Sequence, residues 1–262
     1  MLKKQVHDYW NAESCGIIYT SEQKHTKEYF DQIEEARYRL QPYIPDFAGF
    51  ENYKNKKVLE IGVGAGTDFI QWLRNGAIAT GIDLTQESVM NAKKRCDLEG
   101  FKSTNIIAGD AENLPFNDDE FDCTYSWGVI HHSPDTIKCL SEIIRVTKPG
   151  GKILLMIYNK NSVSAYMVWF RKCLLKGDFF KSLDYAIANY VESPGTKAYT
   201  VSEIKTILSQ FTLKDSNVDT ILAFCDLAQN SKYWFVRLFY KFLSVILGGN
   251  KAGFFMTIEA VK

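Results

Sequence analysis

Gly62, Gly64 and Gly66 cluster directly behind an apolar run, in the stretch VLEIGVGAGTDF at residues 58–69. Glycine weakens both strands and helices, so such a cluster indicates a turn that something else must approach closely. An acid, Glu60, lies inside the end of the apolar run. Its carboxylate repels a pyrophosphate and favours a ligand that carries a positive group. The stretch therefore predicts a binding turn between a strand and a helix.

The usual ligand of a strand, a glycine-rich turn and a helix is a dinucleotide. Its fingerprint, G-x-G-x-x-G, requires glycine at position 67, where this chain has Thr67. The expected helix also lacks a Tyr-x-x-x-Lys pattern. A nicotinamide-dependent oxidoreductase is therefore an alternative that this loop disfavours.

The elements that must position the turn follow from the periodicity of the sequence, in which short β-branched runs alternate with helical patterns. Strands are expected at residues 57–63, 78–84, 104–110, 121–130, 152–158, 212–218 and 253–262, and helices at 29–40, 67–76, 85–100, 135–151 and 200–211. This alternation predicts an α/β fold, a doubly wound, mostly parallel seven-stranded sheet of the Rossmann-like type with a helical cap. Ligands of such sheets bind beyond the carboxyl ends of the strands.

We expect four segments along the chain. Residues 1–50 form an N-terminal helical lid, and residues 51–160 form the core that binds the ligand. Residues 161–200 interrupt the alternation and are expected to insert a helical cap over the site. Residues 201–262 complete the core sheet and carry an apolar helical insertion near 221–250.

Composition restricts the class of protein. Lysine plus arginine and aspartate plus glutamate each number 31, so no basic field gathers nucleic acid. The six cysteines lie far apart and without metal-ligand spacing, so free thiols, a cytoplasmic location and no bound metal are expected. The N-terminus lacks the apolar core of a secretory signal, and no stretch reaches the roughly 18 apolar residues of a membrane span. We expect a soluble, intracellular protein.

Five motifs follow one another along the core: VLEIGVGAGTD, GIDLT, GDAENLPF, YSWGVIHHSPD and RVTKPGGKILL. In this order they resemble the E/D-x-G-x-G-x-G loop, the acid that ends the second strand, the G/A-D-A-x-x-L-P-F segment, the fourth-strand motif and the turn into the fifth strand of class I S-adenosylmethionine-dependent methyltransferases. The resemblance spans about residues 55–160. It is to the group of ubiquinone- and menaquinone-biosynthesis-like small-molecule methyltransferases.

The resemblance implies that S-adenosyl-L-methionine binds at the turn and leaves as S-adenosyl-L-homocysteine. Asp83 then accepts hydrogen bonds from both ribose hydroxyls, and Leu84 covers one face of the adenine. Asp83 as a helix cap, Asp110 as a turn former and Trp127 as plain core remain alternatives. The residues that the resemblance assigns to the cofactor are Glu60, Gly62, Gly64, Gly66, Asp83, Leu84, Asp110, Ala111, Glu112, Ser126 and Trp127.

His131 and His132 stand at the mouth of the expected site. An oxygen acceptor profits from a base, and an imidazole suits that task near neutral pH. Adjacent residues point apart, so at most one of the two faces the acceptor, and His131 is the first choice. A histidine that only packs or caps is the alternative. The residues expected around the acceptor are Tyr9, Trp10, Tyr19, Tyr158, Asn159 and Tyr199.

Two apolar stretches, residues 163–175 and 233–247, depart from the family pattern. Arg237, Lys241 and Ser244 recur at helical spacing in the second stretch and leave a very wide apolar face. Burial of the two helices against each other and the core is the preferred interpretation. A homodimer interface is the second. A channel for an apolar acceptor, or peripheral membrane contact, is the third.

Together these observations predict an enzyme that moves a methyl group to oxygen or carbon of a small-molecule acceptor by in-line displacement. A non-catalytic binding module is an alternative, which the presence of Glu60, Asp83 and Asp110 disfavours. Methylation of RNA or protein is disfavoured by the balanced charge and by the absence of an N/D-P-P-Y/F tetrad.

Overall fold

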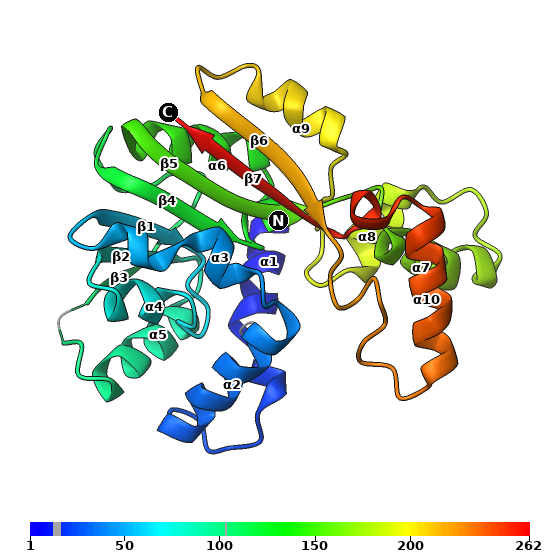
Figure 1. Cartoon of the computed structure of the whole chain (residues 1–262), viewed down its shortest axis with the longest axis horizontal. Coiled ribbons are helices and arrows are strands. Elements are labelled where there is room, and N and C mark those ends of the chain that lie inside the picture. Colours follow the sequence, from blue (N-terminus) through cyan, green and yellow to red (C-terminus); the bar gives the residue numbers. More distant parts are fainter. Residues whose placement is uncertain (13–16, 103) are drawn as a thin grey trace.

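A seven-stranded sheet forms the centre of the chain in the computed structural model (Figure 1). Its spatial order is β3-β2-β1-β4-β5-β7-β6. β1 to β5 pair in parallel, whereas β7 runs antiparallel to both β5 and β6. The predicted doubly wound, mostly parallel sheet is confirmed. The strands are β1 Lys57–Ile61, β2 Ile78–Asp83, β3 Asn105–Ala108, β4 Phe121–Trp127, β5 Thr147–Tyr158, β6 Lys214–Ile221 and β7 Phe255–Val261.

The helices cover the sheet and extend beyond it. In the view of Figure 1, α7, α8 and α10 gather on one side of the molecule, and α1 and α2 extend below the sheet. The α-helices are α1 Leu2–Ala12, α2 Lys27–Leu40, α3 Ile44–Ala48, α4 Phe69–Arg74, α5 Gln86–Leu98, α6 Thr136–Val146, α7 Val163–Lys172, α8 Leu183–Tyr190, α9 Val201–Leu208 and α10 Trp234–Ile246.

The structure describes residues 1–12, 17–102 and 104–262, so Cys15 lies outside the described residues. Among the described helices, none has the length and apolarity required to span a bilayer. The described cysteines carry free thiols, at Cys96, Cys123, Cys139, Cys173 and Cys225.

Apolar layers cover both faces of the sheet. Val58 packs in one layer with Trp72 of α4, and Leu59 packs in the other with Ile143 of α6 and Leu208 of α9. Adjacent residues of a strand point to opposite faces, so this division of β1 follows from its period of two. The sheet is therefore held rigidly from both sides.

The junction of α6 with β5 differs from the prediction of a helix that continues to residue 151. The helix ends at Val146, and residues 147–151 belong to the strand. Thr147 has extended backbone, and its hydroxyl donates to the carbonyl of Ile143 at 2.6 Å. The carbonyl of Ile143 also accepts the backbone N–H of Thr147, so the hydroxyl adds a second hydrogen bond where the helix ends.

The preferred interpretation of the stretch 233–247 as a buried helix is wrong. The stretch forms α10, in which Ser244 is buried and Trp234, Phe235 and Phe242 are exposed. In the other apolar stretch, α7 buries Val163 at its first turn. A helix carries a wide apolar stripe when the stripe faces something. In α10 that face is turned outward.

The turn between β1 and α4 depends on Gly62, whose backbone is left-handed with φ +82°. A Cβ at this position would lie 2.2 Å from Cγ2 of Val129, the second residue after the end of β4. Close approach of two protein segments, rather than of a ligand, therefore requires this glycine. A Cβ on Gly66 would likewise lie 3.0 Å from Cα of Ala92 in α5. Gly64, with φ +52°, donates its backbone N–H to the side-chain carboxylate of Asp83.

We expect Gly62→Ala to destabilise the protein more than Gly100→Ala does. Gly100 has φ +83° and open space around its Cβ position, so both variants share the left-handed strain of about 1–2 kcal/mol. The clash with Val129 adds about 1–3 kcal/mol to Gly62→Ala alone. Urea unfolding measures both free energies. Val129→Ala in the Gly62→Ala background should recover part of the difference, and equal losses in the two single variants would contradict the steric explanation.

Candidate functional site

A cavity of about 580 Å³ opens at the carboxyl ends of β1, β2 and β4. Its walls come from the β1–α4 turn, the ends of β2 and β4, the N-terminal helices, and the segments that flank α7 and α10. Small-molecule sites are commonly about 300–1,000 Å³ and mostly apolar with a few polar groups. Sequence-predicted residues that line this cavity are Tyr9, Trp10, Tyr19, Glu60, Gly62, Gly64, Asp83, Leu84, Asp110, Ala111, Trp127, His132 and Tyr158.

Asp83 ends β2 with its carboxylate held by backbone N–H groups. Oδ2 accepts from Gly64 N at 3.1 Å, and Oδ1 accepts from Thr85 N at 3.0 Å. Burial raises the pKa of Asp83, against the opposing effect of these hydrogen bonds. The N-cap of α5 is Thr85, whose Oγ1 accepts from Ser88 N. The helix-cap alternative for Asp83 is therefore wrong, and Asp83, which also accepts from the Thr85 hydroxyl at 3.1 Å, lines the cavity.

Glu60 lies at the bottom of the cavity, 3% exposed, at the end of β1. Its Oε2 accepts from the indole Nε1 of Trp72 at 2.8 Å. Burial, and then the negative charge of Asp68, raise the pKa of Glu60 well above its ordinary value. A buried acid with a single neutral donor is costly to ionise. A cation beside it would offset that cost.

Asp68, in the same turn, is a buried acid that the sequence analysis did not single out. Arg37 of α2 donates to it with two nitrogens, with Nε at 3.0 Å from Oδ1. Tyr125 of β4 donates to Oδ2 at 2.8 Å, and Tyr38 donates to Oδ1 at 3.1 Å. This charge-assisted, two-nitrogen contact fixes α2 to the floor of the cavity. Arg37 and Asp68 both line the cavity.

Lys3 of α1 reaches the end of β3. Its Nζ donates to Oδ2 of Asp110 and to Oε2 of Glu112, each at 2.6 Å. Asp110 and Ala111 line the cavity, whereas Glu112 lies outside its lining and also accepts from Ser133 Oγ and Asp135 N. Burial acts to raise the pKa of Glu112, but hydrogen bonds from Lys3 and Ser133 lower it overall. Glu112 therefore joins the segment around residue 110 to the loop after β4.

Trp127 and Ser126 end β4 with different surroundings. Trp127 lines the cavity, and its Nε1 donates to Oε1 of Gln41 at 2.7 Å. Trp127 also packs against the rings of Tyr43 and Phe255, so it is part of the core as well as part of the cavity wall. Ser126 lies outside the lining and donates its hydroxyl to the carbonyl of Ile61 at 3.2 Å.

The two adjacent histidines have different environments. His131 is fully buried, lies outside the lining of the cavity, and has no hydrogen-bond partner for either ring nitrogen among the described residues. Burial lowers its pKa well below the ordinary value, and its ring lies tilted by 43° against that of Tyr158, with the ring centroids 3.9 Å apart. His132 lines the cavity, with Trp10 of α1 packed against its ring at 5.1 Å. The structure thus favours His132 over His131 as the histidine of the site.

Glu192 completes a polar group around His132. Nδ1 of His132 lies 2.9 Å from both Ser193 Oγ and Thr196 Oγ1. Nε2 lies 3.2 Å from Oε2 of Glu192, which accepts from the Tyr158 hydroxyl at 2.7 Å. Burial acts to raise the pKa of Glu192, but the hydrogen bond and charge of His132 lower it overall. Glu192 holds a left-handed backbone, φ +52°, which is unusual for a residue with a side chain and often marks a functional site.

Asn159 and Tyr199 take no part in the lining of the cavity. The buried amide of Asn159 donates to the carbonyl of Gly253 at 2.8 Å, so it fastens the end of β5 to the segment before β7. Tyr199 pairs with Asn159 through a parallel bridge of the backbone and packs beside the apolar layer under α6 and α9. Asn159 follows β5 and Tyr199 precedes α9, and neither side chain reaches the lining of the cavity.

The remaining part of the cavity is apolar and was missed by sequence reasoning. Leu40 from α2, Val168 from α7, and Phe224 and Phe254 from the segments before and after α10 contribute to it. These residues come from parts of the chain without a motif. The sequence indicated an apolar pocket here only through the unusual apolar content of the two stretches around residues 163–175 and 233–247.

Comparison with known proteins identifies the region that carries the glycine turn. Residues 59–155 match the family model described as a methyltransferase domain. The chain is 39% identical to phthiotriol/phenolphthiotriol dimycocerosates methyltransferase of Mycobacterium tuberculosis over 98 residues, 37% of this chain and 35% of that protein. It is 30% identical to the chloroplastic tocopherol O-methyltransferase of Arabidopsis thaliana over 169 residues, 61% of this chain and 44% of that protein. The chain thus spans less than half the length of these curated relatives.

Solved structures show the same fold over nearly the whole chain. The geranyl diphosphate C-methyltransferase of Streptomyces coelicolor, a complex with Mg²⁺, geranyl diphosphate and S-adenosyl-L-homocysteine, superposes with a TM-score of 0.64 at 13% identity, covering 99% of this chain and 97% of that one. The phosphoethanolamine N-methyltransferase 2 of Haemonchus contortus, with S-adenosyl-L-methionine, gives 0.63 at 18% identity over 98% of this chain and 60% of that one. Residues 59–155 thus match a methyltransferase domain, and the whole chain has the fold of solved S-adenosylmethionine-dependent methyltransferases, whereas the narrower quinone-biosynthesis-like group is not confirmed.

Proposed function

We propose that this protein transfers the methyl group of S-adenosyl-L-methionine to oxygen or carbon of a small-molecule acceptor held in the cavity. The observation that carries the proposal is the set of three carboxylates, Glu60, Asp83 and Asp110, that line one end of a single cavity around a left-handed glycine turn. The cofactor has a cationic sulfonium and ammonium, a ribose diol and an adenine amine. Acceptor groups suit each of these parts.

The residues fit the cofactor in this arrangement. Asp83 accepts from the N–H groups of Gly64 and Thr85 and from the hydroxyls of Thr85 and Ser88, and the two hydroxyls of a ribose diol would take the place of these side-chain hydroxyls. Glu60 supplies negative charge where the glycine turn leaves the strand. Asp110 and Ala111, which follow β3, contact the edge of the adenine. Leu84 covers one face of the adenine. Bound here, the cofactor supplies a methyl group activated by the adjacent sulfonium.

The acceptor occupies the apolar part of the cavity in this proposal. Trp10, Tyr158 and Phe254 surround it, so water is excluded and the acceptor is held in line with the methyl group. His132 and Glu192 receive the proton that an acceptor hydroxyl or acidic carbon loses. With Nδ1 held by Ser193 and Thr196, Nε2 of His132 and the Glu192 carboxylate share one proton position at the cavity wall.

The other interpretations receive no support. The comparisons name methyltransferases, not oxidoreductases. A non-catalytic module has no need of buried acids beside the turn, because their burial is costly. The free thiols of the described cysteines fit the reducing cytoplasm that we propose as location.

The test of the function is transfer of label from methyl-labelled S-adenosyl-L-methionine into a cell extract. The extract is partitioned between organic and aqueous phases, with the Asp83→Ala protein as the inactive control. Labelled product that appears with the wild-type protein alone supports the proposal. Tight binding of a nicotinamide dinucleotide without binding of S-adenosyl-L-homocysteine would refute it.

We expect Asp83→Ala to weaken the binding of S-adenosyl-L-homocysteine by about 1.5–3 kcal/mol, because hydrogen bonds to a charged group are lost. Isothermal titration calorimetry measures the affinity, and thermal unfolding confirms that the variant is folded. Asp135→Ala is the matched control, since Asp135 also accepts a backbone N–H at a helix start but lies outside the lining of the cavity. Unchanged affinity of Asp83→Ala would refute the ribose assignment.

We expect cofactor affinity to rise with pH through the raised pKa of Glu60 and to level off above it. Below that pKa the acid is neutral and attracts no cation, so binding of S-adenosyl-L-methionine releases a proton. The same raised pKa makes the ligand-free protein lose stability as pH rises from 4.5 toward the folded value, because the folded state holds the proton longer than the unfolded state. Calorimetry in buffers of different ionisation enthalpy counts the protons. Glu60→Gln, which keeps an acceptor for Trp72, should abolish the release.

We expect Glu192→Gln to lower turnover by about 10²–10⁴-fold, the usual contribution of a general base, with unchanged affinity for S-adenosyl-L-homocysteine. His131→Phe keeps a ring packed against Tyr158 and loses no hydrogen bond known among the described residues, so turnover should persist and stability should rise by about 1 kcal/mol. The measurement is the rate of label transfer across pH for each protein. The reverse result, with His131→Phe inactive and Glu192→Gln active, would show that His131 is the base.

A further inference from the structure

The outward side of α10 carries seven large apolar side chains that the described part of the chain leaves exposed. Their exposed fractions are 68% for Trp234, 55% for Phe235, 58% for Leu238, 50% for Phe239, 61% for Phe242, 68% for Val245 and 62% for Ile246. We name these seven residues the α10 ridge. Proteins rarely expose a contiguous apolar surface of this kind unless it binds something.

The ridge is continuous along the helix. At 100° per residue its members span about 140° of the circumference. The opposite side carries Val236, Tyr240 and Leu243, which are half-buried, and Ser244, which is buried. The helix therefore turns a serine inward and aromatic side chains outward, the reverse of a helix that packs only on its own domain.

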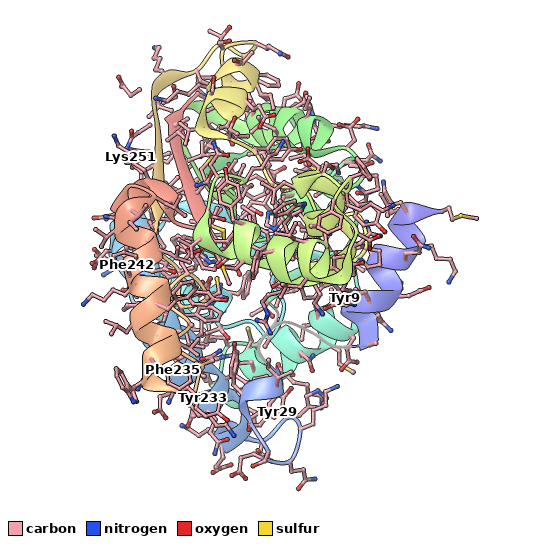
Figure 2. The ribbon with its side chains drawn as sticks, turned by 90° about the vertical axis from the view of Figure 1, so that its right-hand side faces the viewer. Tyr9, Tyr29, Tyr233, Phe235, Phe242 and Lys251 are labelled. Atoms are coloured by element: carbon pink, nitrogen blue, oxygen red, sulfur yellow. The ribbon has the colours of Figure 1, made fainter. Side chains whose placement is uncertain are left out.

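Cations border the ridge, and acids are absent. Arg237 and Lys241 lie along one edge of it, and Lys232 and Lys251 stand before and after the helix. The sequence from Leu227 to Ile258 contains no aspartate or glutamate. Within the described residues none of these four cations forms an ion pair. Figure 2 shows α10 at the margin of the molecule, with Phe235 and Phe242 along it and Lys251 beyond its C-terminal end.

α7 packs against α10, and the segment that follows α7 has the same chemistry as the ridge. Leu175, Phe179 and Phe180 are exposed by 67%, 63% and 103%. The segment that carries them also contains Arg171, Lys172, Lys176 and Lys181, against the single acid Asp178. Two neighbouring segments thus combine apolar side chains with uncompensated positive charge.

The cavity reaches the base of this surface. Phe224 and Cys225 lie on the segment that enters α10, Phe254 and Phe255 lie on the segment that leaves it, and Val168 lies on α7. All five line the cavity. The apolar part of the cavity is therefore built from the same segments that carry the ridge.

We propose that the α10 ridge docks on the surface of an anionic lipid bilayer, and that the methyl acceptor is an apolar molecule drawn from that bilayer into the cavity. An apolar stripe bordered by lysine and arginine is the pattern of a helix that lies in the interface of a membrane. Anionic headgroups supply the negative charge that the chain lacks here. The second half of the proposal rests on the proposed methyl transfer.

A second copy of the chain is a less suitable occupant. In a two-fold dimer the same patch meets itself. Arg237 and Lys241 of one copy would then approach the same cations of the other, and no acid between residues 227 and 258 would compensate them. A bilayer accepts the apolar side chains and the cations together.

The test is flotation of the full-length protein with vesicles of phosphatidylcholine alone or of equal parts phosphatidylcholine and phosphatidylglycerol. We expect binding to the anionic vesicles, weakened by high salt because headgroup attraction is screened. The triple variant Trp234→Ser/Phe235→Ser/Phe242→Ser should bind at least about tenfold more weakly. Arg237→Glu/Lys241→Glu should lose the preference for anionic vesicles.

The matched control is Leu98→Ser/Ile137→Ser, which removes exposed apolar side chains from α5 and α6, away from the ridge. It should bind vesicles like the wild-type protein. The docking proposal is overturned if the wild-type protein does not float with anionic vesicles, or if the triple variant floats equally well. It is also overturned if light scattering shows that the wild-type protein forms a dimer, that the triple variant is monomeric, and that the dimer does not bind vesicles.

Calorimetry with S-adenosyl-L-homocysteine separates this proposal from the proposed function. The triple variant should keep the cofactor affinity of the wild-type protein, because its substitutions lie outside the lining of the cavity. Vesicle binding without cofactor binding refutes the methyl transfer alone, and cofactor binding without vesicle binding refutes the docking alone. Label that passes from the cofactor into the aqueous phase, rather than the organic phase, overturns the apolar acceptor.

Discussion

The cost of burying carboxylates at the end of β1 governs the structure around the cavity. Glu60, Asp68 and Asp83 lie within one turn and the strand beside it, and each would be expensive to hold there without a partner. Each has a donor of a different kind: an indole for Glu60, a guanidinium with two phenols for Asp68, and backbone N–H groups for Asp83. The turn must therefore expose its backbone, and the left-handed Gly64 does so with the N–H that it donates to Asp83.

The N-terminal helices are tied to the cavity by ion pairs of different exposure. Arg37 of α2 pairs with Asp68, the side chains being 17% and 2% exposed, and removing one partner of such a buried pair costs about 3–5 kcal/mol. Lys3 of α1 is 39% exposed and pairs with Asp110, which is 33% exposed, and with Glu112, which is 10% exposed. More exposed pairs contribute less, so α2 is tied to the floor of the cavity more strongly than α1.

The sequence predicted those parts of the fold and site that depend on neighbouring residues. All seven strands follow from local periodicity, and the glycine turn, Asp83 and Asp110 follow from motifs a few residues long. Contacts between distant segments could not be predicted. Arg37 and Asp68 are separated by 31 positions, and Lys3 and Asp110 by 107, with no pattern that pairs them.

The choice between His131 and His132 failed for a related reason. Adjacent residues point apart, so the sequence shows that one faces the cavity but not which. The rotation of the short turn after β4 decides this, and that rotation is set by the contact of Val129 with the Gly62 turn on one side and by the packing of His131 on Tyr158 on the other. The residue next to the motif thus faces the core, and its neighbour faces the cavity.

The prediction that the apolar side of α10 is buried was wrong because the periodicity of a sequence shows that a helix has an apolar side but not what that side contacts. The buried side of α10 needs only Ser244 and a few half-buried side chains, since the core beneath is already closed by the aromatic residues around Phe254 and Phe255. The cavity accordingly changes character along its length, from carboxylates at the glycine turn to phenylalanines beside α10. A polar, charged cofactor suits the first end, and an acceptor that leaves a membrane suits the second. The outward ridge and the inward phenylalanines are carried by the same part of the chain, because Phe224 precedes α10 and Phe254 follows it.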